Sequence, residues 1–369
     1  MISEEHLYAI ALRECNLIGD INFIKLIKVF GSAKNAWENA KKEYRKLEGF
    51  GQKIVSDIGN PLHLEFAEKE LKFCENNEIQ ITLQHLNELP DLLSECPDAP
   101  AILYQKGTYQ HILQPLSIVG TRNMTNYGKQ FINTFFEETK SCDFISVSGL
   151  ALGVDKEVHD QSLQYKIPTA AVLAHGFHTM YPAKNKKLSD RILQEGGVLF
   201  TEFNSSRKPD RENFIQRNRI IAGISPATIV VETAFGGGSI STATFANSYN
   251  RDVFALPGKI TDLYSQGCNH LIFQNKASTI STIKDLISNL GFNKPKEKIE
   301  ELFPLSSTTN QLSDNQRLIY TFIAENPQIN LDDLAQQISL PTYRILPIIL
   351  ELELLGKVKS FSGRQFVAI

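Results

Sequence analysis

Short apolar runs alternate with longer amphipathic stretches from about residue 100 to residue 256. The runs are rich in β-branched residues, and the segments between them have about the length that one crossover helix requires. This alternation predicts β-α units on a parallel sheet. The six predicted strands cover residues 116–119, 144–147, 170–173, 198–201, 228–231 and 253–256. We therefore expect an α/β fold with a Rossmann-like, doubly wound, mostly parallel sheet.

Helical patterns stand on both sides of this predicted sheet. Residues 1–75 are expected to form a helical domain of SAM or helix-hairpin-helix type, with helices at 21–30 and 33–40 and a glycine-containing turn at 47–54. Residues 76–295 are assigned to the Rossmann-like domain, and the polar, proline-punctuated stretch 296–310 to a linker. Residues 311–369 contain helices at 314–324, 331–338 and 343–355 and then two strands, which is the order of a winged-helix domain.

Composition narrows the class of protein. The 369 residues are 42% hydrophobic and 21% charged, as in a globular protein. No apolar stretch reaches the roughly 20 residues of a membrane-spanning helix, and the first residues lack the features of a secretory signal. Five scattered cysteines without C-x-x-C spacing predict buried thiols in a cytoplasmic protein. His175 and His178 flank Gly176 in an expected turn, so neither a metal nor a cofactor is predicted.

The charge is unevenly distributed. The whole chain carries a net charge of −3, which argues against a uniformly basic, polyanion-binding surface. Residues 180–219, however, contain nine basic residues against five acidic ones, a local charge of +4. The C-terminal residues 306–369 contain five basic and six acidic residues, which favours a protein-contacting winged helix over one that reads duplex DNA.

Small residues follow several of the predicted strands. The ends of parallel strands meet at one edge of a sheet, where ligands bind. The first predicted strand is followed by Gly120, Thr121 and Arg122, and the second by Ser148 and Gly149. After the fifth strand, Gly237, Gly238 and Ser239 begin a predicted helix. Glycines allow close approach of an anion, and a helix start offers unpaired N–H groups, so these turns predict a phosphate-binding edge.

A second group of candidate residues is basic. Arg217, Asn218 and Arg219 lie on a predicted helix, and both arginines are expected to project away from the sheet. Lys259 follows the sixth strand and could add charge to the same edge. Asp155 and His159 stand four residues apart on another helix. No nucleophile in a recognisable motif accompanies them, so an intrahelical hydrogen bond that supports the glycine turn is favoured over acid–base catalysis.

These motifs resemble those of the DNA-processing protein A family, also called DprA or Smf. The matching segments include Ile118-Val-Gly-Thr-Arg122, Ser148-Gly-Leu-Ala-Leu-Gly-Val-Asp155 and Tyr181-Pro-Ala-Lys-Asn185. They continue with Phe214-Ile-Gln-Arg-Asn-Arg-Ile-Ile-Ala-Gly, Gly236-Gly-Gly-Ser and Val253-Phe-Ala-Leu-Pro-Gly258. Their order holds across residues 100–290. One departure is Ala174-His175-Gly176, where the family often has a G-x-G turn after the third strand.

The resemblance implies a non-enzymatic protein that binds single-stranded DNA and loads the RecA recombinase onto it, in natural transformation (competence) and DNA recombination. It also implies a homodimer formed through the Rossmann-like domain. The family's arginine after the first strand falls on Arg122, and its R-N-R positions fall on Arg217, Asn218 and Arg219.

Two enzymatic alternatives follow from the fold class. A nucleotide-binding, phosphoribohydrolase-like enzyme would carry a catalytic glutamate just after its glycine–threonine turn, and no carboxylate follows Gly238 here. A dinucleotide-dependent oxidoreductase would need G-x-G-x-x-G after the first strand, whereas the sequence there is Gly120-Thr-Arg-Asn-Met-Thr-Asn-Tyr-Gly128.

Overall fold

The computed structural model describes residues 3–292, 313–326, 329–355, 357–361 and 365–368. The chain divides into two compact units, one up to residue 296 and the other from residue 297. The predicted linker, residues 296–310, lies outside the described residues. Within the described part of the chain, no helix is both long and apolar enough to cross a membrane.

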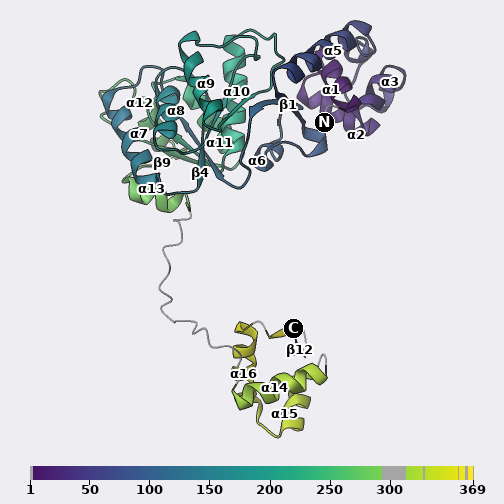
Figure 1. The fold of residues 1–369 in the computed structure, drawn as a ribbon, viewed down its shortest axis with the longest axis vertical. Helices are drawn as coiled ribbons and strands as arrows, with labels where there is room; N and C mark the ends of the chain where they lie inside the picture. The colour runs from purple at the N-terminus through teal and green to yellow at the C-terminus, as the bar shows by residue number, and fades with distance from the viewer. Residues whose placement is uncertain (1–2, 293–312, 327–328, 356, 362–364, 369) are drawn as a thin grey trace. The chain divides into compact units, whose positions relative to one another are not determined.

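A nine-stranded sheet forms the centre of the first unit (Figure 1). Its order is β1-β2-β6-β5-β4-β3-β7-β8-β9, and the seven strands from β6 to β9 pair in parallel. β1 and β2 add an antiparallel edge. The strands are β1 (Ile79–Leu83), β2 (Ile102–Gly107), β3 (Gln114–Val119), β4 (Phe144–Ser148), β5 (Thr169–Val172), β6 (Val198–Thr201), β7 (Ala227–Val230), β8 (Asp252–Ala255) and β9 (Ser278–Thr279). The Rossmann-like prediction is confirmed, and β1, β2 and β9 are additions that it did not include.

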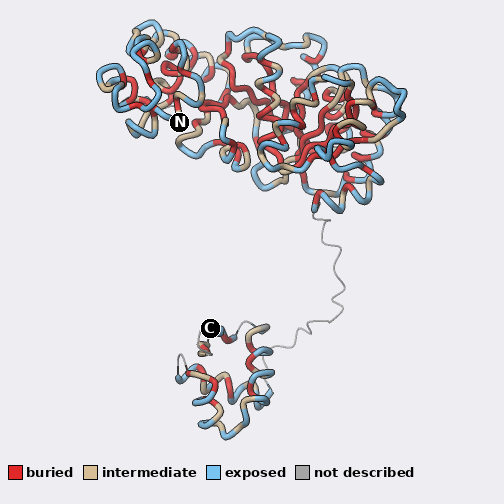
Figure 2. Tube along the Cα trace, turned by 180° about the vertical axis from the view of Figure 1, so that it is seen from behind, coloured by how far each residue is buried: buried red, intermediate tan, exposed pale blue. Residues whose placement is uncertain are grey.

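Helices cover both faces of this sheet because both faces are apolar. On one face, α10 (Arg211–Ile224), α11 (Gly238–Ser248) and α12 (Gln266–Phe273) share a core with β3 to β8. On the other face lie α7 (Asn126–Thr139), α8 (Val154–Gln164), α9 (Lys186–Gln194) and α13 (Ile283–Asn289). Figure 2 shows buried residues concentrated in the interior of the first unit. The chain runs from β3 outward to β6 and then returns to β7 beside β3, which creates a switch point between β3 and β7.

The N-terminal helices pack against the antiparallel edge of the sheet. They are α1 (Glu4–Glu14), α2 (Asp20–Phe30), α3 (Ala33–Glu43), α4 (Gln52–Val55) and α5 (Pro61–Asn76), and the short α6 (Asp91–Ser94) follows β1. Phe23, Leu26 and Trp37 share one hydrophobic core with Ile81 and Ile102 of the edge strands. These helices therefore belong to the same compact unit as the sheet, and a domain boundary at residue 75 stays a prediction.

The second unit is a winged helix, as predicted. It contains α14 (Asp314–Glu325), α15 (Leu331–Ile338) and α16 (Thr342–Leu354). A small antiparallel sheet joins β10 (Ile329–Asn330), β12 (Gln365–Ala368) and β11 (Val358–Phe361), in that order. Its own core includes Ile319, Leu334, Ile345 and Leu352, so this unit has an independent packing centre.

Candidate functional site

A cleft of about 780 Å³ opens at the carboxyl ends of β3 and β7, at the switch point of the sheet. This is the position at which open parallel sheets bind ligands. Its walls come from the turn after β3, the start and middle of α10, and the loop between β7 and α11. Eight of the twelve predicted site residues line it: Gly120, Thr121, Arg122, Arg217, Asn218, Gly237, Gly238 and Ser239. Ser148, Gly149, Arg219 and Lys259 do not.

An exposed arginine and two aromatic rings form one wall of the cleft. The guanidinium carbon of Arg122 lies 5.0 Å from the centroid of the Phe214 ring, a cation–π distance. Tyr181 meets the same ring edge-on, at 5.6 Å between centroids. Arg122 itself is exposed, in the turn that follows β3. The wall thus presents a positive charge beside flat apolar surfaces.

Another part of the cleft lining is the glycine-rich start of α11. Gly236 has φ +69°, a conformation that favours glycine, and Gly237 is the N-cap residue. The first amides of a helix have no intrahelical acceptor and lie at the positive end of its dipole. The Oγ of Ser239 is buried and has no hydrogen-bond partner among the described residues, although Ser239 lines the cleft. This wall can therefore donate hydrogen bonds to an anion.

Arg217 forms the floor of the cleft and is almost fully buried, contrary to the prediction that it projects from the surface. Its Nη1 donates to the carbonyl oxygen of Gly149 at 2.6 Å and to that of Val172. Burial lowers the pKa of Arg217 to about 10, and the carboxylate of Asp155 opposes that shift. Arg217 is held by the ends of β4 and β5, which the helical pattern of α10 could not indicate.

Arg219 is also buried, and its expected projection from the surface is likewise wrong. Its Nη2 forms ion pairs with Glu202 at 2.5 Å and with Asp20 at 3.1 Å. Asp20 begins α2, so Arg219 joins the N-terminal helices to the sheet. The N-terminal helices α1 to α5, called the N-terminal module below, cover a side of α10 that the sequence pattern predicted to face solvent. This is why the guanidinium of Arg219 is enclosed.

Three further predicted residues lie outside the cleft lining. Ser148 is buried, and its Oγ donates to the carbonyl oxygen of Ile118 at 2.7 Å. At Gly149, a Cβ atom would come within 2.3 Å of Nη1 of Arg217, so the glycine makes room for the arginine. Lys259 is exposed after β8. Direct contact of these residues with a ligand stays a prediction.

The basic segment 180–219 offers less free charge than its count suggests. Two of its nine cations are the buried arginines described above. Lys186 pairs with Asp190 at 2.5 Å, and Arg191 pairs with Glu195 at 3.5 Å. The remaining exposed cations of the segment are Lys184, Lys187, Arg207, Lys208 and Arg211. Of these, Arg211 lines the cleft.

Asp155 and His159 do not act as a hydrogen-bonded pair. The expected intrahelical bond is replaced by one to the turn itself: Asp155 is buried and accepts from the amide of Ala151 at 3.3 Å. Nδ1 of His159 instead contacts Oγ1 of Thr169 at 2.7 Å. Burial lowers the pKa of His159 to about 3, which keeps the imidazole neutral. His175 and His178 lie in a turn region, as predicted.

The sequence prediction missed the aromatic wall as a unit. Tyr181 and Phe214 are 33 positions apart, and each is the first residue of a different segment quoted above. Tyr264 also lines the cleft, and its hydroxyl accepts from Nδ2 of Asn123 at 2.9 Å. An aromatic residue among charged residues, such as Phe214, is the sequence signal that points to this wall. Only the fold, however, brings the separate segments together.

A Rossmann-like sheet with an exposed arginine and a glycine-rich helix start at its switch point defines a class of proteins that bind phosphate-containing ligands. Within that class, the chain matches the family model of DNA recombination-mediator protein A over residues 80–291 and that of the DprA winged-helix domain over residues 303–364. The chain belongs to the DNA recombination-mediator protein A family.

Individual relatives agree with this assignment. Protein Smf of Synechocystis is 33% identical over 300 residues, which is 79% of this chain and 74% of that protein. DNA processing protein DprA of Bacillus subtilis is 38% identical over 205 residues, 55% of this chain and 68% of the relative. The solved structure of DprA from Streptococcus pneumoniae aligns with a TM-score of 0.60 and 26% identity, covering 78% of this chain and 98% of that one.

A second solved structure is that of DNA processing protein A from Helicobacter pylori, a protein with a described single-stranded DNA binding mode. It aligns with a TM-score of 0.52 and 28% identity, covering 57% of this chain and 95% of that one.

Proposed function

We propose that this protein binds single-stranded DNA in the cleft between β3 and α11 and loads the RecA recombinase onto that DNA. The observation that carries the proposal is the cleft itself, which is lined by both the exposed Arg122 and the glycine-rich start of α11. The relative from Helicobacter pylori, which binds single-stranded DNA, supports the choice of ligand.

The proposed mechanism is mainly electrostatic. Arg122 and the first amides of α11 hold successive phosphates. Phe214 and Tyr181 offer ring surfaces on which a base can stack, a contact that tolerates any sequence. Arg217 acts indirectly, because its hydrogen bonds to Gly149 and Val172 keep the floor of the cleft in place. Most bases remain accessible to the recombinase.

An enzymatic role is not favoured by the carboxylates near the glycine-rich loop. Glu232 accepts from the amide of Thr125 at 2.8 Å and from its hydroxyl at 2.5 Å, so it fixes the start of α7. Asp210 caps α10 by accepting from the amide of Glu212 at 3.0 Å. Asp155 supports the turn after β4. These three carboxylates have structural partners, and we propose a binding protein of the cytoplasm rather than a phosphoribohydrolase.

The decisive experiment is a salt titration of oligothymidylate binding by fluorescence anisotropy. Arg122→Ala removes one phosphate contact and should lower the magnitude of the slope of log K against log salt concentration by about 0.7, the single-strand value per phosphate. The control is Arg45→Ala, which removes an exposed arginine from the N-terminal helices. An unchanged slope and affinity in the cleft variant, or an equal loss in the control, would contradict the assignment.

RecA loading is tested separately. RecA ATPase activity on DNA coated with single-strand-binding protein should begin sooner with the wild-type protein than with Arg122→Ala. If both proteins shorten the lag equally, the cleft is not the loading site. The proposed homodimer through the Rossmann-like domain is tested by sedimentation of the full chain, where a monomer at micromolar concentration would contradict it.

A further inference from the structure

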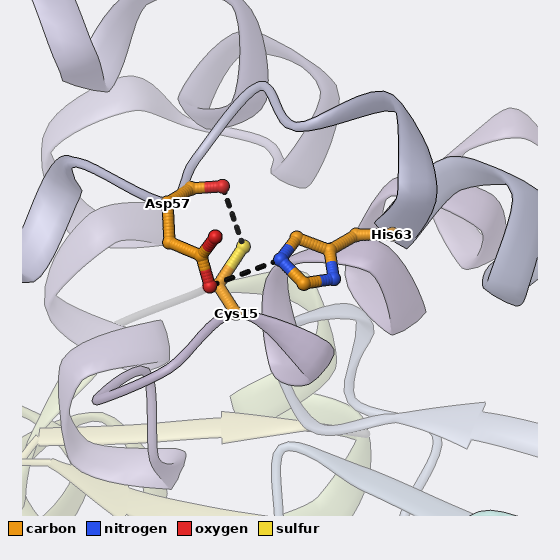
Figure 3. Close-up of side chains that lie close together, drawn as sticks. All are labelled: Cys15, Asp57 and His63. Carbon is orange, nitrogen blue, oxygen red and sulfur yellow. Dashed lines mark hydrogen bonds and ion pairs between the residues drawn. The ribbon is translucent and has the colours of Figure 1, made fainter.

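A cysteine, an aspartate and a histidine meet among the N-terminal helices, far from the cleft residues in sequence. Cys15 is the C-cap residue of α1, Asp57 follows α4, and His63 lies in the first turn of α5. Sγ of Cys15, a carboxylate oxygen of Asp57 and a ring nitrogen of His63 all lie within 4.8 Å of one another (Figure 3). Three helical segments thus place three different metal-ligand types at one point.

The hydrogen bonding of this cluster is incomplete. Nε2 of His63 lies 3.0 Å from Oδ2 of Asp57, yet it is a buried nitrogen without a hydrogen bond of acceptable geometry. The thiol of Cys15 makes only long contacts, to the carbonyl oxygens of Ala11 at 3.4 Å and Asp57 at 3.6 Å. The ring nitrogen and the sulfur lie within 4.8 Å of each other and of the Asp57 carboxylate, and the sulfur is only weakly engaged.

The ionisation states of the cluster fit a divalent cation. The amide of Asn16 donates to Asp57 at 2.9 Å and is the main cause that lowers the pKa of its carboxyl, so Asp57 is an anion. Burial raises the pKa of Cys15 to about 12, and the Asp57 carboxylate adds to that shift. A bound cation would reverse this effect on the thiol. One thiolate and one carboxylate would then neutralise the two charges of the ion.

We propose that Cys15, Asp57 and His63 form a Zn²⁺ site that ties the end of α1 to the start of α5. A mixed sulfur, nitrogen and oxygen set suits zinc, whereas Ca²⁺ and Mg²⁺ take oxygen ligands. Zinc bonds of about 2.0–2.3 Å in a tetrahedron hold ligand atoms about 3.3–3.8 Å apart, so side-chain rotations that close about 1 Å complete the site. Water takes the fourth position, and the proton of Cys15 passes to solvent on binding.

No local pattern predicts this cluster, because its members are 42 and 6 positions apart, without a zinc-site spacing. The site cross-links two helices of the N-terminal module, and its role is structural. It lies outside the DNA-binding proposal, and DNA affinity is not its readout.

The test is a calorimetric titration of the full, chelator-treated protein with ZnCl₂ in two buffers of different ionisation enthalpy. The wild-type protein should bind one Zn²⁺ per chain with submicromolar affinity and release one proton. Cys15→Ser and Asp57→Asn should each weaken binding at least tenfold, while Cys142→Ser, at a cysteine outside the cluster, should not. Co²⁺ in place of Zn²⁺ should give a thiolate charge-transfer band that Cys15→Ser abolishes and Cys142→Ser retains.

Two results would overturn the proposal. One is the absence of Zn²⁺ binding by the wild-type protein at micromolar concentrations. The other is equal binding by the wild-type protein and the Asp57→Asn variant. Circular dichroism identifies a variant that fails to fold. In that case, the proton count and the Co²⁺ band of the wild-type protein show whether Cys15 is a ligand. A proton release near zero, or a Co²⁺ spectrum without a thiolate band, excludes Cys15 as a ligand.

Discussion

Arg217→Met should destabilise the protein strongly, because the arginine is a structural element beneath the cleft. Methionine keeps the apolar part of the side chain but removes the two hydrogen bonds from Nη1 to Gly149 and Val172. Those carbonyl oxygens would each lose a charged donor in a buried position, and Asp155 would lose its opposing charge. Breaking a buried charge interaction of this kind costs about 3–5 kcal/mol.

The matched variant is Arg122→Met. This arginine is exposed, and its interaction with Phe214 contributes about 1 kcal/mol or less. Urea unfolding followed by the emission of Trp37 suits the comparison. Trp37 is the single tryptophan of the chain, and it is buried in the same compact unit as Arg217.

Arg217→Met should affect stability and not the DNA-binding salt slope, whereas Arg122→Met should affect the slope and not stability. Arg217→Met should lose about 3–5 kcal/mol of unfolding free energy, and its folded fraction should keep the wild-type salt slope. Arg122→Met should keep its stability and lose about 0.7 from the slope. A stability loss below about 1 kcal/mol for Arg217→Met, or a reduced slope in its folded state, would refute the structural role.

Three further predictions concern the cleft, the protein's acid sensitivity and its helical module. Gly238→Ala should keep the fold, because a Cβ there meets nothing within 4 Å, and should weaken oligothymidylate binding several-fold by anisotropy, because the methyl group stands at the anion-facing helix start. Burial holds the pKa of His159 near 3, so below pH 6.5 the unfolded chain binds a proton that the folded protein does not, and stability falls as the pH falls. Between pH 6.5 and pH 5, the unfolding free energy measured in urea should fall by about 2 kcal/mol. The His159→Gln variant should lack this loss. Arg219→Met should lower the unfolding free energy by about 3–5 kcal/mol because it leaves two carboxylates without their shared cation, whereas Arg191→Ala, at a surface ion pair, should change it by less than about 1 kcal/mol. Equal effects of the two arginine variants would argue against a buried network.

Local pattern predicted most of the central sheet. The six expected strands agree with β3 to β8 within two residues at either end, because a buried parallel strand between helices leaves a continuous apolar run in the sequence. The three helices of the winged helix were predictable from the helical spacing of their apolar residues. The antiparallel β1 and β2 were missed, since their partners are set by tertiary contacts with the N-terminal helices.

The predictions for the candidate site also divide into those that follow from local pattern and those that depend on tertiary contacts. Residues in the loops that follow strands, such as Arg122 and Gly237, line the cleft, because the carboxyl ends of parallel strands share one edge. The two arginines of α10 were misplaced. Their helix pattern indicated solvent, but one side chain enters the sheet edge and the other meets the N-terminal module.

The sequence by itself determined which segments become strands and helices, and which turns carry glycine, serine and arginine. These properties depend on periodicity and on residues adjacent in the chain. The tertiary structure alone decided which charges remain available to a ligand. A cation is buried or exposed according to its partners, and Asp20, the ion-pair partner of Arg219, lies 199 positions away. The meeting of Cys15, Asp57 and His63 is determined in the same way, because no local pattern specifies contacts between separate helices.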